Sequence, residues 1–122
     1  MFMEETERNK IIDNEIRRLS DILKEVDSKK RRTAKGLIEE CGFMKATLIE
    51  LKGIIAESGV INEMPQGEYS ILREHPALKS YNATIQRYTT VIDKLMGLLP
   101  KDAQKPDDDL SSLVGFLNER DD

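Results

Sequence analysis

The chain has few of the residues on which catalysis, disulfide bonding and membrane insertion depend. Its 122 residues include one Cys, one His and no Trp. A single Cys excludes an internal disulfide and gives no sign of an oxidising compartment. No apolar run approaches the roughly 20 residues that span a bilayer, and the acidic start Met1–Glu5 lacks the features of a signal peptide. We therefore expect a cytoplasmic protein that makes no contact with membranes.

Aromatic residues are scarce too, with three Tyr and three Phe, and hydrophobic residues make up 39% of the chain against 34% charged. This composition is poor for an independent globular core and suits helices that each bury one narrow stripe. A chain of this length often covers its remaining apolar surface with neighbouring subunits. The composition therefore favours a homo-oligomer. If its subunits associate through a heterologous interface and the arrangement closes, the oligomer is a ring.

Charge is distributed unevenly, although the net charge is only −4. Residues 1–36 hold ten basic and eight acidic residues, whereas residues 101–122 hold three basic and seven acidic ones. A basic front and an acidic tail indicate different partners for the two ends. For any single charge, a solvated surface is the simpler alternative.

Three stretches repeat apolar residues at alternating spacings of three and four, the period at which helices wind around one another. The first stretch predicts a helix over residues 1–28, and the second predicts a helix over residues 33–58. The third begins at Pro76, which suits a first helical turn, and predicts a helix over residues 76–99. The sequence thus predicts an all-α fold of long antiparallel helices.

The second and third stretches supply the candidate residues for the core and for oligomerisation. These residues are Leu37, Cys41, Met44, Leu48, Leu51, Ile55, Tyr81, Ile85, Tyr88 and Ile92. Gly36, Gly42 and Gly53 lie inside the second predicted helix, where each costs about 1 kcal/mol relative to Ala. We interpret these glycines as sites of close helix approach, with a kink as the alternative. Residues 1–100 form the predicted helical oligomerisation domain.

Residues 60–75 separate the second and third predicted helices. Pro65 prevents a continuous helix there, and Gly67 suits a turn. The alternation around Tyr69 and Ile71 leaves two forms open, a short loop or a small hairpin. A connection this long between packed helices predicts a function or a partner of its own.

Residues 101–122 form a polar, acidic tail that ends in a short amphipathic helix by its sequence pattern. The candidate partner-binding residues of this tail are Leu110, Leu113, Val114 and Leu117. Because so short a helix is not stable alone in water, we expect it to dock onto a partner.

No grouping of residues in the sequence indicates catalysis. We interpret His75, beside Pro76 at a helix start, as structural, and Cys41, on an apolar stripe, as a small core residue. The sequence has no phosphate-binding Gly-rich loop and no metal-ligand spacing, and consecutive carboxylates such as Asp107–Asp109 are usually solvated. We therefore predict a protein that is not an enzyme and that uses no cofactor and no metal.

The strongest charged feature is a basic run that follows the first predicted helix. Its candidate DNA-binding residues are Lys29, Lys30, Arg31, Arg32 and Lys35. Such clusters bind nucleic-acid backbones by neutralising phosphates. Repetition around an oligomer would multiply contacts that are weak in one subunit. The alternative is a solvated corner between two helices.

The stretch from Leu37 to Lys101 resembles the central part of phage terminase small subunits, particularly those from phages of Gram-positive bacteria. The resemblance covers about half the chain and is carried by short motifs. These are Leu37-Ile38-Glu39-Glu40-Cys41-Gly42-Phe43-Met44 with Leu48 and Leu51, then Gly59 and Gly67, then Arg73-Glu74-His75-Pro76-Ala77 leading to Tyr81, and finally Tyr88 and Leu95-Met96-Gly97-Leu98-Leu99-Pro100.

This resemblance implies a non-catalytic DNA-packaging subunit in an infected or lysogenic bacterial host. Family members form rings, bind double-stranded viral DNA and regulate the large terminase subunit, which hydrolyses ATP and cuts DNA. Many carry an N-terminal helix-turn-helix, which this sequence lacks, and residues 101–122 correspond to the part that often meets the large subunit. The alternative is a helical scaffold or regulatory coiled-coil protein that binds only proteins.

Overall fold

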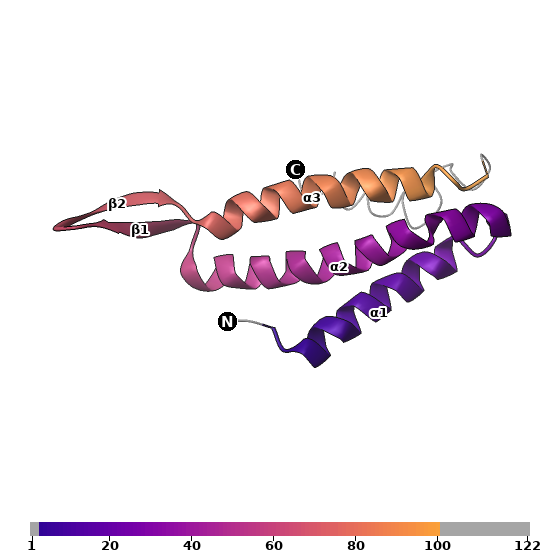
Figure 1. Cartoon of the computed structure of the whole chain (residues 1–122), viewed down its shortest axis with the longest axis horizontal. Coiled ribbons are helices and arrows are strands. Elements are labelled where there is room, and N and C mark those ends of the chain that lie inside the picture. The colour runs from indigo at the N-terminus through magenta and orange to yellow at the C-terminus, as the bar shows by residue number, and fades with distance from the viewer. Residues whose placement is uncertain (1–2, 101–122) are drawn as a thin grey trace, which may run out of the picture.

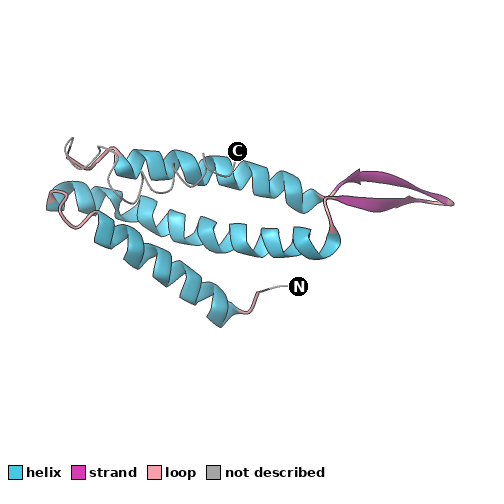
Figure 2. Cartoon of the chain, turned by 180° about the vertical axis from the view of Figure 1, so that it is seen from behind, coloured by secondary structure: helices cyan, strands magenta, loops and turns pink. Residues whose placement is uncertain are grey.

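The structure, a computed structural model, describes residues 3–100 and has three helices and one β-hairpin (Figure 1). The elements follow the order α1 (Glu5–Ile22), α2 (Ser28–Ser58), β1 (Ile61–Gln66), β2 (Tyr69–Glu74) and α3 (Pro76–Met96). Helices α2 and α3 lie side by side and antiparallel, and α1 packs against α2 at the end away from the hairpin. The hairpin projects beyond the opposite end of the helices, and no other described element covers it (Figures 1 and 2).

The expectation of an all-α fold is wrong, because strands hold 12% of the described residues beside the 71% that are helical. Of the two forms left open for the connection, the chain adopts the hairpin. Strands β1 and β2 pair antiparallel, from Ile61 opposite Glu74 to Gln66 opposite Tyr69. Gly67 has a φ of +68°, the left-handed conformation that a two-residue hairpin turn favours and that Gly adopts without strain. Pro65, which cannot donate to a helix, fits this exposed two-stranded ladder.

The helix bounds differ from the predicted ones most clearly around the first turn between helices. Helix α1 ends at Ile22, and the following residues form a tight turn in which Leu23 and Val26 are buried. Helix α2 begins already at Ser28, where the Arg31 amide donates to the Asp27 carbonyl oxygen at 2.9 Å. No Gly or Pro interrupts the basic run, and Lys and Arg are good helix formers. The basic run therefore lies inside the helix and not in a corner before it.

The buried core lies where all three helices meet, away from the hairpin. Its buried members are Leu19, Leu23, Val26, Ala34, Ile38, Cys41 and Leu95. Met44, Tyr88 and Ile92 pack against this cluster and are partly buried, and Leu48 is buried farther along α2. Leu37, in contrast, is 37% exposed.

Helix α1 reaches along α2 as far as Glu50 and Leu51, and beyond these residues only α2 and α3 continue toward the hairpin. Leu51 and Ile55 on α2 and Tyr81 and Ile85 on α3 are all of intermediate exposure. A pair of helices has no third element to close its apolar stripe, so these residues keep surface available to a neighbouring chain. Near the hairpin, the apolar residues of α2 and α3 are therefore only partly covered by the chain itself.

One of the three glycines inside α2 lies at a close helix approach. A Cβ atom on Gly42 would lie 3.0 Å from the Ile12 carbonyl oxygen and 3.2 Å from the Ile16 side chain on α1. Around Gly36 and Gly53, by contrast, nothing lies within 4 Å of such an atom. The interpretation of close approach is thus right for Gly42 and wrong, within the described chain, for the other two.

This difference predicts opposite effects of the same substitution. Gly42→Ala forces a methyl group onto the α1 backbone and should lower the free energy of unfolding by about 1–2 kcal/mol, since overpacking outweighs the gain in helix propensity. Gly36→Ala and Gly53→Ala should each raise it by about 0.5–1 kcal/mol. Urea denaturation of the three variants measures these changes. A stabilised Gly42→Ala variant would contradict the close packing of α1 on α2.

Candidate functional site

The five candidate DNA-binding cations all lie in the first two turns of α2 and are exposed. For Lys29, Lys30 and Arg31, in the first turn, this position is electrostatically unfavourable, because the N-terminal end of a helix carries partial positive charge and each cation there costs about 0.3–1 kcal/mol. The first turn of α2 contains no acidic residue, and the Asp27 side chain makes no capping hydrogen bond. An anionic partner at this end would relieve both the helix dipole and the repulsion among the cations.

The structure does not gather the five cations into one patch. Arg31, Arg32 and Lys35 lie on the side of α2 that faces α1, and Lys29 and Lys30 lie on the side that faces α3. Helical geometry separates them, because successive residues differ by about 100° around the axis. Lys94 on α3, which the sequence interpretation missed, joins the second group.

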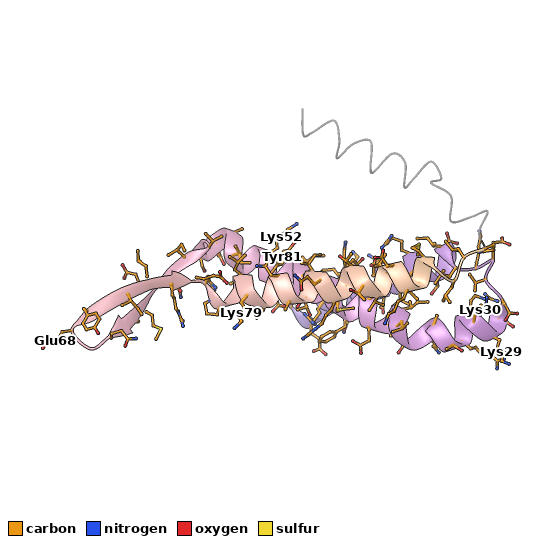
Figure 3. All side chains as sticks on the ribbon, turned by 90° about the horizontal axis from the view of Figure 1, so that it is seen from above. Lys29, Lys30, Lys52, Glu68, Lys79 and Tyr81 are labelled. Atoms are coloured by element: carbon orange, nitrogen blue, oxygen red, sulfur yellow. The ribbon has the colours of Figure 1, made fainter. Side chains whose placement is uncertain are left out.

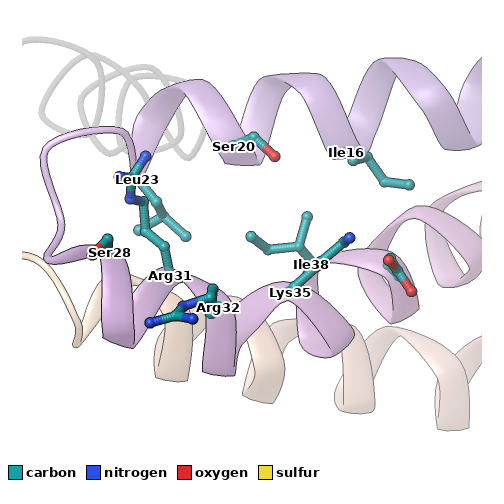
Figure 4. Close-up of a pocket in the computed structure, with 9 residues that line it drawn as sticks. Ile16, Ser20, Leu23, Ser28, Arg31, Arg32, Lys35 and Ile38 are labelled. Atoms are coloured by element: carbon teal, nitrogen blue, oxygen red, sulfur yellow. The ribbon is translucent and has the colours of Figure 1, made fainter.

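Each group of cations borders a groove with an apolar floor. The α1–α2 groove has a volume of about 470 Å³ and is lined by Ile16, Ser20, Leu23, Ser28, Arg31, Arg32, Lys35, Ile38 and Glu39 (Figure 4). The α2–α3 groove has a volume of about 360 Å³ and is lined by Lys29, Lys30, Thr33, Ala34, Leu37, Lys94 and Leu98. Both grooves combine a basic rim, which could pair with carboxylates or phosphates, with an apolar floor, which suits an amphipathic partner.

The hairpin exposes an apolar surface on both faces of a two-stranded sheet. Leu72 is 73% exposed and Tyr69 is 67% exposed, and Ile61 and Ile71 are also exposed. In the register, Ile61 and Leu72 share one face, while Tyr69 and Ile71 lie on the other with Met64. Isolated two-stranded hairpins are marginally stable in water. The hairpin therefore has the character of a contact surface.

A buried polar cluster joins the three helices at the edge of the core. The Glu15 carboxylate on α1 is 4% exposed and accepts hydrogen bonds from Arg18 Nε at 2.8 Å and from the Tyr88 hydroxyl on α3. The Lys45 ammonium on α2 lies 5.9 Å from the centre of the Tyr88 ring. The bond between Tyr88 and Glu15 ties α3 to α1, while Arg18 holds the carboxylate from within α1.

The pKa values in this cluster reflect burial and hydrogen bonding. Burial alone would raise the pKa of Glu15, but hydrogen bonds from Arg18 and Tyr88 bring it below its ordinary value. Burial, and then the bond to Glu15, raises the pKa of Tyr88 well above its usual range. Burial and the nearby Glu15 charge also raise the pKa of the Cys41 thiol to about 11. The Cys41 thiol is therefore favoured in its protonated form at neutral pH.

Tyr88→Phe should destabilise the protein and reduce its pH dependence. Loss of the hydroxyl removes a donor from a buried carboxylate, which costs about 1–3 kcal/mol. The pKa of Glu15 is lower in the folded protein than its ordinary value of 4.5. Its contribution to the free energy of unfolding is therefore complete above pH 4.5 and disappears as the pH falls further. The pKa of Tyr88 is higher in the folded protein than its ordinary value of 10. Its contribution to the free energy of unfolding is therefore complete below pH 10 and disappears at higher pH.

Urea denaturation between pH 3 and pH 11 measures the loss of stability at low pH and the loss at high pH. Tyr81→Phe is the matched control. The Tyr81 hydroxyl makes no hydrogen bond within residues 3–100, so its removal should change neither the loss of stability at low pH nor the loss at high pH. Equal losses of stability in the two variants would show that the Glu15–Tyr88 bond contributes nothing.

The remaining residues that could take part in catalysis or metal binding were also located. His75 caps α3, because its Nδ1 accepts a hydrogen bond from the Ala77 amide at 3.0 Å. Within residues 3–100, no group of three or more His, Cys, Asp or Glu side chains is placed to hold a metal ion. Among the described helices, none has the length and apolar composition needed to cross a membrane. The tail residues Leu110, Leu113, Val114 and Leu117 lie outside the described residues.

None of the protein-family models, curated proteins and solved structures compared with the chain matches it. The residues and their geometry therefore carry any functional proposal.

Proposed function

We propose that this chain is a non-catalytic DNA-packaging subunit of the terminase small-subunit kind. In this proposal it forms a homo-oligomer, binds double-stranded viral DNA through the basic end of α2, and regulates the large packaging ATPase and nuclease. The proposal rests on an incomplete surface for self-assembly at one end of the molecule and uncompensated positive charge at the other.

The exposed hairpin is the observation that carries the proposal. Strands β1 and β2 project from the helices with apolar side chains on both faces and with both outer edges unpaired in the described chain (Figure 1). Such a hairpin is stabilised when a further strand or helix covers it. Burial of one large apolar side chain contributes about 1.5–3 kcal/mol. Association of several copies would supply that cover along with cover for the half-buried α2–α3 stripe.

The basic end of α2 supports the part of the proposal that concerns DNA. Lys29, Lys30, Arg31 and Arg32 lie on a helix N-terminus that would itself attract phosphate. One subunit could neutralise only a few phosphates, which gives weak and salt-dependent binding. An oligomer would repeat these contacts at fixed spacing, so that several subunits could bind one duplex together.

A scaffold that binds only proteins is the second candidate, and the two grooves favour it. Their apolar floors would be of little use to a phosphate backbone but would suit an amphipathic helix. Binding of duplex DNA by the intact oligomer separates the two candidates. The packaging role further requires a large ATPase, encoded near the gene for this chain, whose ATP hydrolysis changes when the oligomer is added.

We expect light scattering to give a mass above that of a dimer at tens of micromolar. Ile61→Ala with Leu72→Ala removes the apolar side chains from one face of the hairpin and should weaken association at least about tenfold, since 1.4 kcal/mol corresponds to a factor of ten. Glu63→Ala with Glu74→Ala changes charged residues on the same face and is the control. A stable monomer for the unmodified chain would overturn the proposed assembly.

A further inference from the structure

The α1–α2 groove has a basic rim whose cations lack partners. Within residues 3–100, Arg31, Arg32 and Lys35 form no ion pair and no hydrogen bond through their side chains. They lie along one side of a floor that includes Leu23 and Ile38 (Figure 4). Arginine pairs with carboxylates through two parallel hydrogen bonds, so this rim favours an acidic ligand with apolar side chains close to its charges.

The chain itself contains a segment with these properties. Three consecutive acidic residues, Asp107–Asp109, directly precede apolar residues at spacings of three, one and three. These apolar residues are Leu110, Leu113, Val114 and Leu117. This is the spacing with which an amphipathic helix fills an apolar groove. The segment lies outside the described residues, and its sequence is complementary to the groove in charge and in polarity.

The segment also begins near enough to reach the groove. Leu98 and Leu99 pack against the core at the end of the bundle that carries the basic residues, and the described chain ends at Pro100. Six residues, 101–106, separate Pro100 from Asp107, and the seven steps along the chain between these two residues span up to roughly 23–25 Å when extended. A helix with its side chains is about 10–12 Å across. The connection can therefore pass α2 and reach the α1–α2 groove.

Of the two basic grooves, the α1–α2 groove is the better match. The α2–α3 groove has lysines and no arginine on its rim, and Leu98, which leads into the connection, already occupies part of its floor. The α1–α2 groove is larger and offers two guanidinium groups beside Lys35.

We propose that residues 107–117 dock in the α1–α2 groove, with their carboxylates on Arg31, Arg32 and Lys35 and their apolar side chains on its floor. This docking goes beyond the proposed function and does not depend on it. It would give the chain an internal competitor for polyanions, since the tail would cover three of the five candidate DNA-binding cations. DNA and the tail would then compete for Arg31, Arg32 and Lys35.

Zero-length crosslinking of the full chain with a carbodiimide tests the docking directly. The reagent joins a lysine amine to a carboxylate in contact with it, and peptide mass spectrometry identifies the pair. We expect crosslinks from Lys35 to Asp107, Asp108 or Asp109 at about 0.1 M salt and a several-fold lower yield at 1 M, where charges are screened within about 3 Å instead of about 10 Å. Crosslinks of these aspartates to Lys29 or Lys30 alone, or to no lysine, would overturn the proposal.

A charge exchange keeps the test specific to this groove. Arg31→Glu with Arg32→Glu should release the tail, which a dye on Asn118→Cys reports as a fall in fluorescence anisotropy; Cys41 is buried and should not react. Adding Asp107→Lys and Asp108→Lys should restore the higher anisotropy. Lys52→Glu with Lys79→Glu is the control, because both lysines are exposed and lie far from the groove (Figure 3). Equal anisotropy in all four proteins would overturn the proposal, and none of these outcomes depends on DNA.

Discussion

Leu95→Ala should lower the free energy of unfolding by about 2–5 kcal/mol, the range observed when a buried leucine is truncated and leaves a cavity. Leu95 is 0% exposed and lies within the cluster where all three helices meet. Its neighbours come from three helices at once, so the structure has little freedom to close around the missing atoms. Most small domains have a total stability of only about 5–15 kcal/mol.

The same substitution at Leu72 provides the control. This leucine is 73% exposed on the hairpin, so Leu72→Ala should change the unfolding free energy by less than about 0.5 kcal/mol at concentrations where the chain is monomeric. Its effect should appear in association. Urea denaturation over a range of protein concentrations measures both quantities, because assembly makes apparent stability depend on concentration. Similar unfolding losses at the two positions would contradict the assignment of the core.

The helical periods in the sequence predict all three helices because that signal is local, but their ends differ by up to six residues from α1 (Glu5–Ile22), α2 (Ser28–Ser58) and α3 (Pro76–Met96). The sequence does not decide between a loop and a hairpin at residues 60–75, because a two-stranded ladder depends on pairing between residues that alternation alone does not identify. Gly67 and Pro65 indicated the turn and the interruption of the helix. They did not show that Tyr69–Glu74 would pair with Ile61–Gln66 and remove the chain from the all-α class.

Glu15 shows what the periods could not reveal. Its neighbours Ile12, Ile16 and Leu19 define the apolar stripe of α1, and a charged residue beside that stripe is expected to be solvated. Its burial depends on Tyr88, which is 73 positions away in sequence. No local pattern in the sequence joins the two residues.

The basic run was found from the sequence, but its arrangement was not. Four consecutive cations can form one patch when they belong to a turn. When they belong to a helix, their side chains point in different directions around the helix axis. The position of the helix start therefore decides which cations can act together. Here the start at Ser28 places Arg31 and Arg32 on one side of α2 and Lys29 and Lys30 on the other.

Replacing Lys30 and Arg31 by Ala should weaken duplex DNA binding and make it less dependent on salt. Each phosphate neutralised contributes a slope of about −0.9 to the logarithm of affinity against the logarithm of salt concentration. Loss of two contacts should make the slope less steep by about 1.8, which corresponds to roughly a tenfold difference in the affinity change between 50 and 200 mM salt. Several subunits on one duplex would enlarge the effect. The variant removes one cation from each side of α2 and none from the core.

Fluorescence anisotropy of a labelled duplex across this salt range measures the slope, and light scattering checks that the oligomer is unchanged. Lys52→Ala with Lys79→Ala is the matched control, since it removes the same charge from exposed positions nearer the hairpin (Figure 3). If DNA binds along the basic end of α2, only the first variant changes the slope. If both variants change it equally, binding follows net charge and has no site on α2. If the intact oligomer does not bind duplex DNA even at low salt, the protein-only scaffold is the better description, because uncompensated cations at a helix N-terminus would then serve an acidic protein partner.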